Sequence, residues 1–409
     1  MSDSEFDFIV FGATSFVGKI LCAYLTEHYS DGSVKWAMAG RSATKLEALK
    51  TELGEKANLV PVIVADAADE QQLTAMANQT NLIVSTVGPY ALYGEPLVKV
   101  CCETGTDYCD LTGETQWIAQ MLDKYQAKAK ASGARIVNCC GFDSIPSDMG
   151  VLFLQEKAHE QFGHYCYRVK MRVKAMKGGF SGGTVASLLN VAKEAAKDPA
   201  LRRTLTNPYA LCPANHPFFA RQASNNKAKY DSDFQQWTAP FVMASINTRV
   251  VHRSNGLLEA RYGKNFLYDE AMLSPSAFKA KAMAYGLGAF MVSAAVGPLR
   301  SAMESLFLPK PGDGPSPDEQ ENGFYNMHFF GETATGQTIK CKVTGDKDPG
   351  YGSTAKMLAE TAIFFSQHSN DEKDSCTDGG FWTPSTLFGM PLVERLSEKA
   401  GLTFELLTD

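Results

Sequence analysis

An apolar run near the N-terminus, Phe8 to Phe11, leads directly into the turn GATSFVG, Gly12 to Gly18. A short glycine turn between an apolar strand and a helix is typical of parallel α/β sheets, whose strands need helical crossovers. Gly12 permits the tight turn, and Gly18 lets the helix pack closely on the strand. The N–H groups that open such a helix form an anion site, which favours a dinucleotide-binding fold. The predicted phosphate loop consists of Gly12, Ala13, Thr14, Ser15, Phe16, Val17 and Gly18.

The loop departs from the usual G-x-x-G-x-x-G spacing, because Ser15 stands at the middle glycine. A hydroxyl there can still donate to a phosphate, although the backbone approaches it less closely. Taken alone, this motif also fits a surface turn. The interpretation therefore depends on the strands that follow.

A second apolar run, Val34 to Gly40, is followed by Arg41 and Ser42. NAD-binding folds carry an Asp or Glu near this position to bind the ribose 2′-hydroxyl. A guanidinium instead suits a 2′-phosphate, which it can contact through two charge-assisted hydrogen bonds. We therefore predict NADP(H) as the cofactor, with Arg41 and Ser42 at the 2′-phosphate. The alternative is an exposed arginine at a helix start.

The next two predicted strands also end in residues suited to a dinucleotide. Leu59 to Asp66 ends in a carboxylate, which we expect either to meet the adenine amino group or to cap the helix beginning near Asp69. Asn81 to Thr86 runs into small residues that leave room for the nicotinamide. The cofactor-binding residues predicted from these strands are Asp66, Thr86, Val87, Gly88 and Pro89.

The alternation of strand and helix continues through Asp107–Leu111 and Arg135–Cys140. We expect an α/β fold: a Rossmann-type doubly wound parallel sheet, then a second mixed α/β domain with an antiparallel sheet. The predicted divisions are 1–160 for the NADP-binding Rossmann domain, 161–345 for an α+β domain that binds substrate and dimerises, and 346–409 for a segment that packs back on the Rossmann domain.

The second half begins with a strictly alternating strand, Tyr167 to Lys174, whose polar face is basic. That face is either a solvated surface or a site for an anionic carrier arm. Further strands are expected at Phe241–Asn247, Arg249–Ser254 and Leu257–Tyr262, and a hairpin at Phe324–Glu332 and Gln337–Thr344, with a last strand at Leu402–Leu407.

Composition excludes several classes of partner. The chain of 409 residues has a net charge of −6, which argues against nucleic acid. Seven scattered histidines without close pairs predict no metal site, and the ten cysteines lack C-x-x-C spacing. With no recognisable secretory leader, we expect a cytoplasmic protein with reduced thiols.

One segment, residues 282–299, is apolar throughout and is flanked by Lys279, Lys281 and Arg300. Its length approaches that of a membrane span, but it contains three glycines and a proline. Three interpretations stay open: a buried or pocket-lining helix, a helix on a membrane surface, and a span. The first two favour a hydrophobic acyl substrate, and the second adds a peripheral membrane contact.

Five motifs in this order, GATSFVG, AGRS, STVGPY, YCDLTGE and GFDSIPSDMG, resemble the saccharopine dehydrogenase-like oxidoreductases, nearest the trans-acting enoyl reductase branch. The C-terminal stretches GDKDPGYGSTAKMLAE and GGFWTPSTLFG resemble that branch too. The resemblance implies an NADP(H)-binding Rossmann domain and a second domain that pairs subunits into a homodimer. The cationic side chains that would hold a dicarboxylic amino acid are not matched.

The predicted function is therefore an NADPH-dependent oxidoreductase that reduces a C=C bond of an unsaturated acyl or lipid-type substrate. Tyr90, Tyr93 and Asp143 are the catalytic candidates, with Asp110 and Glu114 nearby at strand ends. Each also has a structural interpretation as a cap, a packing residue or a loop anchor. Two alternatives stay open: a saccharopine-type imine or amino-acid dehydrogenase, and a non-catalytic NADP(H)-binding sensor or membrane-associated scaffold.

Overall fold

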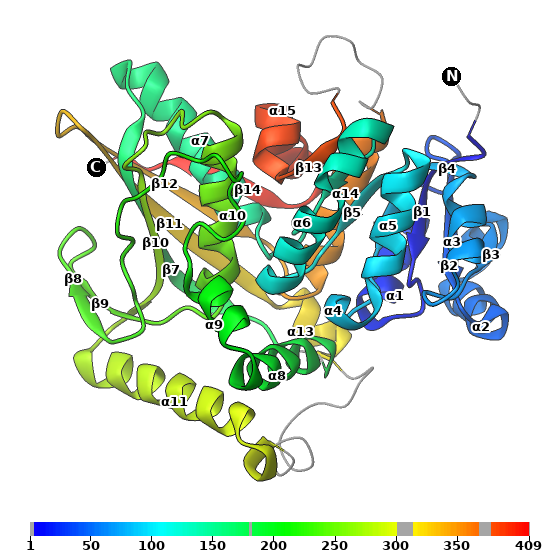
Figure 1. Cartoon of the computed structure of the whole chain (residues 1–409), viewed down its shortest axis with the longest axis horizontal. Helices are drawn as coiled ribbons and strands as arrows, with labels where there is room; N and C mark the ends of the chain where they lie inside the picture. The colour runs from blue at the N-terminus through cyan, green and yellow to red at the C-terminus, as the bar shows by residue number, and fades with distance from the viewer. Residues whose placement is uncertain (1–3, 180–181, 301–313, 368–377, 409) are drawn as a thin grey trace.

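The computed structural model describes residues 4–179, 182–300, 314–367 and 378–408, and these residues form two seven-stranded sheets (Figure 1). The first sheet has the order β13-β6-β5-β4-β1-β2-β3, and every pair in it is parallel. Its strands are β1 (Phe6–Phe11), β2 (Trp36–Gly40), β3 (Val62–Val64), β4 (Thr80–Ser85), β5 (Asp107–Asp110), β6 (Arg135–Val137) and β13 (Gly380–Trp382).

Helices cover both faces of this sheet, as the alternation of its side chains requires. Phe8 and Val10 of β1 pack into one core cluster, and Ile9 and Phe11 pack into the other. The connecting elements are α1 (Phe16–His28), α2 (Ala43–Leu53), the 3-10 helix η1 (Glu55–Leu59), α3 (Glu70–Ala77), α4 (Tyr90–Tyr93), α5 (Glu95–Thr104), α6 (Thr115–Ser132) and α7 (Ile145–Phe162). The predicted doubly wound sheet is confirmed, and its strand order reverses between β1 and β4.

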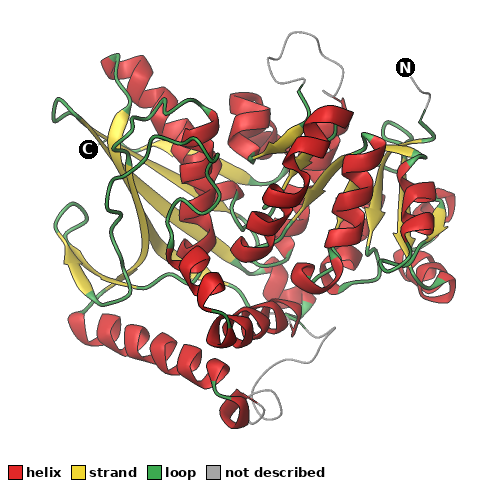
Figure 2. Cartoon of the chain, viewed as in Figure 1, coloured by secondary structure: helices red, strands yellow, loops and turns green. Residues whose placement is uncertain are grey.

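The second sheet has the order β14-β12-β11-β7-β10-β9-β8 and is mixed, because β7 and β10 are parallel while its other pairs are antiparallel. Its strands are β7 (Cys166–Lys177), β8 (Lys229–Asp231), β9 (Gln236–Ala239), β10 (Leu267–Ser274), β11 (Phe324–Thr333), β12 (Thr338–Gly345) and β14 (Leu402–Leu406). The other helices are α8 (Gly182–Lys197), α9 (Pro199–Thr206), α10 (Ala244–Leu257), α11 (Ala277–Ala295), α13 (Pro317–Glu321), α14 (Gly352–Gln367) and α15 (Pro384–Lys399). Figure 2 shows the two sheets with helices packed around them.

The three strands expected between residues 241 and 262 are wrong, because α10 occupies Ala244–Leu257 and turns follow it up to Tyr262. The β-branched residues of this segment suggested strands, but the preference for strand is weak and depends on context. Ile246 and Val250 are one helical turn apart and are both buried. Helical burial against the protein core therefore outweighs local propensity.

The C-terminal segment contributes to both sheets. β13 pairs with β6 at the edge of the parallel sheet, and β14 pairs with β12 at the edge of the mixed sheet. The expected last strand is thus confirmed at Leu402–Leu406, and the hairpin formed by β11 and β12 is confirmed as well.

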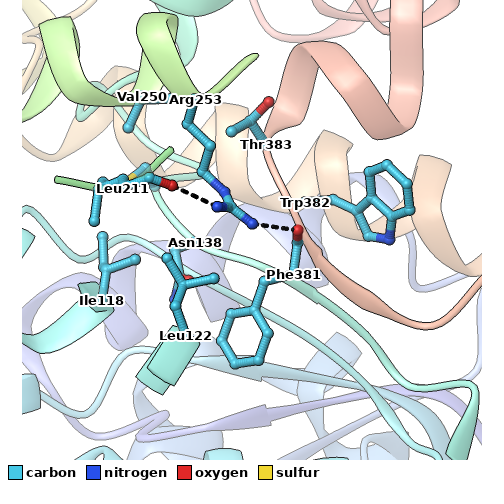
Figure 3. A pocket seen from close by; sticks show the side chains of 10 residues that line it. Ile118, Leu122, Asn138, Leu211, Val250, Arg253, Phe381, Trp382 and Thr383 are labelled. Atoms are coloured by element: carbon cyan, nitrogen blue, oxygen red, sulfur yellow. Dashed lines mark hydrogen bonds between the residues drawn. The ribbon is translucent and has the colours of Figure 1, made fainter. Parts of the chain in front are cut away.

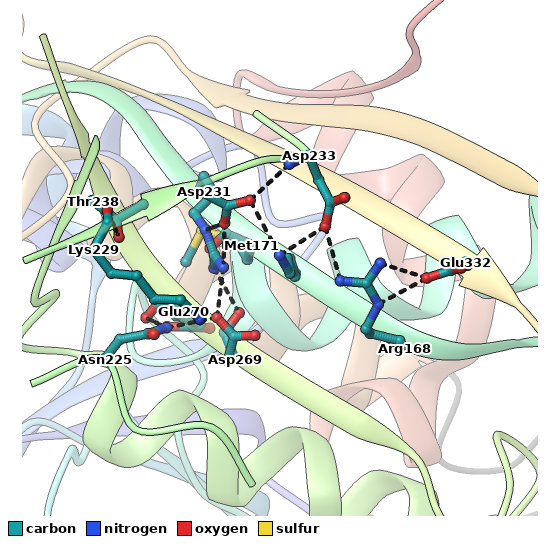
Figure 4. Close-up of polar contacts among 12 residues, drawn as sticks. Arg168, Met171, Asn225, Lys229, Asp231, Asp233, Thr238, Asp269, Glu270 and Glu332 are labelled. Carbon is teal, nitrogen blue, oxygen red and sulfur yellow. Dashed lines mark hydrogen bonds and ion pairs between the residues drawn. The ribbon is translucent and has the colours of Figure 1, made fainter. Parts of the chain in front are cut away.

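The basic face of β7 is neutralised by acidic side chains from neighbouring strands and a turn (Figure 4). Arg172 is paired with Asp231 and Asp269, each at 2.8 Å or less. The remaining pairs join Arg168 to Asp233 and Glu332, and Lys170 to Asp231 and Asp233. Because these cations already have partners, this part of the strand offers no open site to an anionic arm.

The apolar segment 282–299 lies largely on α11, and of the three open interpretations the structure does not support a buried helix. Within α11 only Ala280 and Ala294 are buried. The described part of the chain contains no helix with the length and apolar character needed to cross a membrane.

A buried carboxylate joins the two ends of the chain. Glu360 of α14 accepts hydrogen bonds of 2.7 Å from the hydroxyls of Tyr24 and Tyr29, and one of 2.8 Å from Nε of Arg395. The side chain of Glu360 is fully buried, whereas that of Arg395 is 18% exposed. This single carboxylate thus ties α1 to α14 and α15.

Replacing Glu360 with Ala should lower the free energy of unfolding by about 3 kcal/mol, because Arg395 loses its counter-ion and two hydroxyls lose an acceptor. Guanidinium denaturation followed by circular dichroism measures this change. The matched control is Glu52→Ala, since Glu52 forms an exposed ion pair with Lys19; it should cost no more than about 0.5 kcal/mol. Equal losses in the two variants would contradict the role of Glu360.

Candidate active site

The turn after β1 has the geometry of a phosphate-binding loop. Gly12 has a φ of +93°, and a Cβ at this position would lie 2.7 Å from Oγ1 of Thr86. A Cβ on Gly18 would overlap the carbonyl oxygen of Gly12. Both glycines are therefore required by the close approach of α1, β1 and β4. Phe16 and Val17 open α1, so their N–H groups have no acceptor within the helix and are available to a pyrophosphate.

Ser15 caps α1 instead of leaving its side chain unengaged. Its Oγ accepts a hydrogen bond of 2.9 Å from the N–H of Gly18 and lies 3.0 Å from Oγ1 of Thr86. Thr86 in turn donates to the carbonyl oxygen of Gly12 at 2.9 Å. The hydroxyl of Ser15 thus links the first loop to the end of β4, and direct phosphate binding by this hydroxyl stays a prediction.

The adenosine end of the predicted site lies at β2 and β3. Ser42 caps α2, while the side chain of Arg41 is exposed beside it. Asp66 accepts a hydrogen bond of 2.9 Å from the N–H of Ala68, whereas Asp69 is the residue that caps α3. The alternative of Asp66 as the helix cap is therefore wrong. Among the described residues Arg41 has no ion pair, and only one carboxylate oxygen of Asp66, Oδ1, accepts a hydrogen bond within the turn, so contacts of both residues with the cofactor stay predictions.

The segment from Thr86 to Tyr90 is held by a carboxylate from the next loop. Glu114 accepts hydrogen bonds of 2.9 Å from the N–H groups of Tyr90 and Ala91 and from the hydroxyl of Ser187 on α8. Before Tyr90 this segment contains Thr86, Val87, Gly88 and Pro89, the residues predicted to bind the cofactor. Burial raises the pKa of the Glu114 carboxyl. Glu114 thus acts as a positioning residue that fixes the loop after β4 and attaches α8 to it.

The two tyrosine candidates have different surroundings. Tyr90 is buried against Trp117, and its hydroxyl donates to the carbonyl oxygen of Ser85 at 2.9 Å. Burial raises the pKa of Tyr90 well above its usual value. Tyr93, one turn later, is half exposed. The hydroxyl of Tyr90 is therefore occupied by the end of β4, and that of Tyr93 lies near solvent.

Asp110 fixes the loops that follow β5 and β6. Its carboxylate accepts from the hydroxyl of Tyr108, the amide of Asn138 and the N–H groups of Thr112 and Cys139, at 2.8–3.1 Å. Burial raises the pKa of Asp110 to about 6. Four donors on one buried carboxylate indicate a structural role for Asp110 at the edge where ligands bind in open α/β sheets.

Asp143 differs from these carboxylates. It lies in the loop after β6, and its Oδ2 is 2.8 Å from where a Cβ of Gly113 would be, so it touches the loop after β5. Among the described residues, no side chain or N–H group donates a hydrogen bond to it. Burial, together with the negative charge of Glu270, raises the pKa of Asp143 to about 7.

Glu270 on β10 was not anticipated from the sequence. It accepts from the hydroxyl of Tyr268 at 2.7 Å and the amide of Asn247 at 3.0 Å, and burial raises its pKa to about 7. A pair of acidic residues in an apolar strand, Asp269 and Glu270, was the available signal. Through Glu270, the mixed sheet contributes a carboxylate close to Asp143.

Two further contacts close this side of the site. Asp148 accepts from Ser254 at 2.6 Å and from the N–H of Ser385 at 2.9 Å, which joins α7 to α10 and α15. Arg253 donates to the carbonyl oxygens of Leu211 and Phe381 (Figure 3). The cavity beside it measures about 10 Å³, room for one water molecule. Arg253 is thus a structural clamp.

The described residues contain no group of His, Cys, Asp and Glu side chains arranged to hold a metal ion. The Rossmann sheet, its glycine loop and an exposed arginine at the end of β2 together fit an NADP-dependent oxidoreductase. In agreement with this class, residues 8–137 match the family model described as the saccharopine dehydrogenase NADP binding domain.

Full-length relatives extend this match. A protein of Mycobacterium tuberculosis, provisionally named a trans-acting enoyl reductase, is 39% identical and covers 98% of this chain and 97% of its own length. A trans-acting enoyl reductase of Mycobacterium bovis is 35% identical over 97% of this chain and 96% of its own. Apo saccharopine dehydrogenase (L-Glu forming) of Saccharomyces cerevisiae shares the fold, with a TM-score of 0.55 at 15% identity over 98% and 99% of the two chains. The chain belongs to the saccharopine dehydrogenase-like oxidoreductases, and the predicted family, fold class and cofactor are confirmed.

Replacing Arg41 with Glu should remove the preference for NADPH over NADH. The loss of charge-assisted contacts to the 2′-phosphate, together with repulsion, should weaken NADPH binding at least about tenfold and leave NADH binding nearly unchanged. Calorimetric titration of both cofactors measures this effect. Lys56→Glu, the same charge reversal outside the β2–α2 turn, is the control. A preserved preference in Arg41→Glu would refute the predicted contact.

Proposed function

We propose that this protein is an NADPH-dependent reductase that reduces the C=C bond of an unsaturated acyl or lipid-type substrate. The observation that carries the proposal is similarity along nearly the whole chain to relatives named trans-acting enoyl reductases. Bound NADPH would supply the hydride, and the protein must hold the alkene beside it and deliver a proton. The remaining steps depend on residues of this chain.

Positioning depends on the loops at the carboxyl ends of β4, β5 and β6. Glu114 holds the segment that begins at Thr86, and Asp110 holds the loops that follow β5 and β6. These buried carboxylates keep the loop backbone rigid, which limits the conformational entropy that is lost when a substrate binds. Their hydrogen bonds are made within the protein, so neither carboxylate is assigned to proton transfer.

Asp143 is the proposed proton donor to the α-carbon of the substrate. With a pKa raised to about 7, about half of the Asp143 carboxyls hold a proton at neutral pH, where an ordinary aspartate is ionised. The neighbouring charge of Glu270 contributes to this shift. Tyr90 is the weaker candidate, because its hydroxyl proton is already donated to Ser85.

The test of the reaction class is NADPH consumption with matched substrate panels. Conjugated acyl thioesters or esters should support oxidation of NADPH, and longer acyl chains should lower KM. An oxoacid supplied with an amine should not support oxidation. Turnover with the oxoacid and amine alone would indicate an imine reductase, and no turnover with either panel despite cofactor binding would indicate a sensor; both results contradict the proposal.

Replacing Asp143 with Asn should lower kcat about 100-fold or more while NADPH binding is retained, since a general acid contributes a factor of that order. In the unaltered protein, kcat should fall as the pH rises through about 7, because the donor must be protonated. That limb should vanish in Asp143→Asn.

The control for this prediction is Glu270→Gln, which removes the negative charge beside Asp143 and keeps the size of the side chain. The pKa of Asp143 should then fall, so the limb should move to lower pH while activity at acidic pH is kept. A full pH limb in Asp143→Asn would assign the proton to another group.

A further inference from the structure

The exposed surface of α11 carries a continuous apolar stripe. Phe278, Tyr285 and Val292 of this helix are 82%, 77% and 63% exposed. They recur every seventh residue, and because seven residues make almost two helical turns, these side chains point to one side. A single exposed apolar side chain is common on a protein surface, but a regular row of large ones is not. Contiguous apolar patches mark interaction sites.

The opposite side of the same helix attaches it to the protein. Ala280 and Ala294 are buried, and Leu287 between them is half-buried. Ala294 packs with Leu189 and Ala192 of α8 in a small cluster. Figure 1 shows α11 along the outer edge of the molecule, below α8 and the hairpin of β8 and β9. The stripe therefore lies on the side of α11 that faces away from α8 and is largely exposed.

The charged residues in the sequence segment that carries the stripe are all cationic. The sequence between Glu270 and Glu304 contains no Asp or Glu, but it contains Lys279, Lys281 and Arg300. Lys279 and Lys281 are exposed at the start of α11. This local excess of positive charge contrasts with the net charge of −6 of the whole chain. An apolar stripe with cations beside it matches a surface that is apolar within and anionic at its rim.

We propose that α11 binds the surface of an anionic lipid bilayer, lying in its plane with the stripe of Phe278, Tyr285 and Val292 among the acyl chains. Such helices insert by about 5–10 Å and combine apolar burial with attraction to anionic headgroups. Lys279 and Lys281 would then lie at headgroup level. The proposal stands on this surface alone and does not depend on the proposed reduction.

A second copy of the chain is the competing occupant, and charge argues against it. In a two-fold dimer each partner presents the same face. Parallel packing of two α11 helices about a two-fold axis brings Lys279 and Lys281 of one copy near the same lysines of the other. The stripe segment has no acidic residue to compensate this repulsion. Anionic lipid supplies the missing charge.

The experiment is co-flotation of the full chain with vesicles of equimolar phosphatidylcholine and phosphatidylglycerol, and with phosphatidylcholine alone. The unaltered chain should float with the anionic vesicles, less with the neutral ones, and less at high salt. The double variant Phe278→Ser/Tyr285→Ser should lower the partition coefficient at least about tenfold, since each lost aromatic removes apolar burial. Lys279→Gln/Lys281→Gln should weaken binding to anionic vesicles only.

The matched control is Leu59→Ser/Phe219→Ser, which removes two equally exposed apolar side chains elsewhere. It should bind vesicles like the unaltered chain, and circular dichroism and NADPH titration should show that all variants are folded. Failure of the unaltered chain to float, or equal flotation of the stripe variant, would overturn the proposal. Sedimentation that shows a dimer broken by the stripe variant, without vesicle binding, would assign the face to a second copy instead.

Discussion

The close approach of three backbone segments at Gly12 is the constraint on which the site depends. A Cβ there would meet the side chains of Thr86 and Val87, and one at Gly18 would meet the carbonyl of Gly12. The hydroxyls of Ser15 and Thr86 then join the start of α1 to the end of β4. The result is a helix start with unpaired N–H groups at the point where strand order reverses, which is where α/β sheets bind ligands.

Carboxylates of one chemical type have different functions around this point, and hydrogen bonding decides which. Asp110, Glu114 and Asp148 are buried, and each accepts several donors from separate elements, so they hold loops and helices together. Asp143 is held by no donor among the described residues, and its pKa is raised to about 7 by burial and by Glu270. A group that keeps its proton near neutral pH and is not engaged elsewhere is suited to proton transfer.

The sequence predicted the parallel sheet well, because buried strands, glycine turns and helix starts are local features. It also predicted the glycine turn between β1 and α1 and the hairpin of β11 and β12. It failed at α10, where packing overrode strand propensity, and it left α11 undecided, because an apolar pattern does not say which face is covered. Glu270 was missed since its proximity to Asp143 depends on how two sheets meet. The neutralisation of Arg172 likewise depends on strands distant in sequence.

In the proposed reaction, the nucleotide-binding turn, the rigid loops and the carboxyl of Asp143 act together on a conjugated double bond. The most direct test is isotope transfer from NADPH deuterated at the reactive C4 position to a conjugated acyl thioester, followed by mass spectrometry and NMR of the product. We predict one deuterium at the β-carbon and one solvent-derived proton at the α-carbon. A saturated product without deuterium, or no product while the cofactor is bound, would contradict the account.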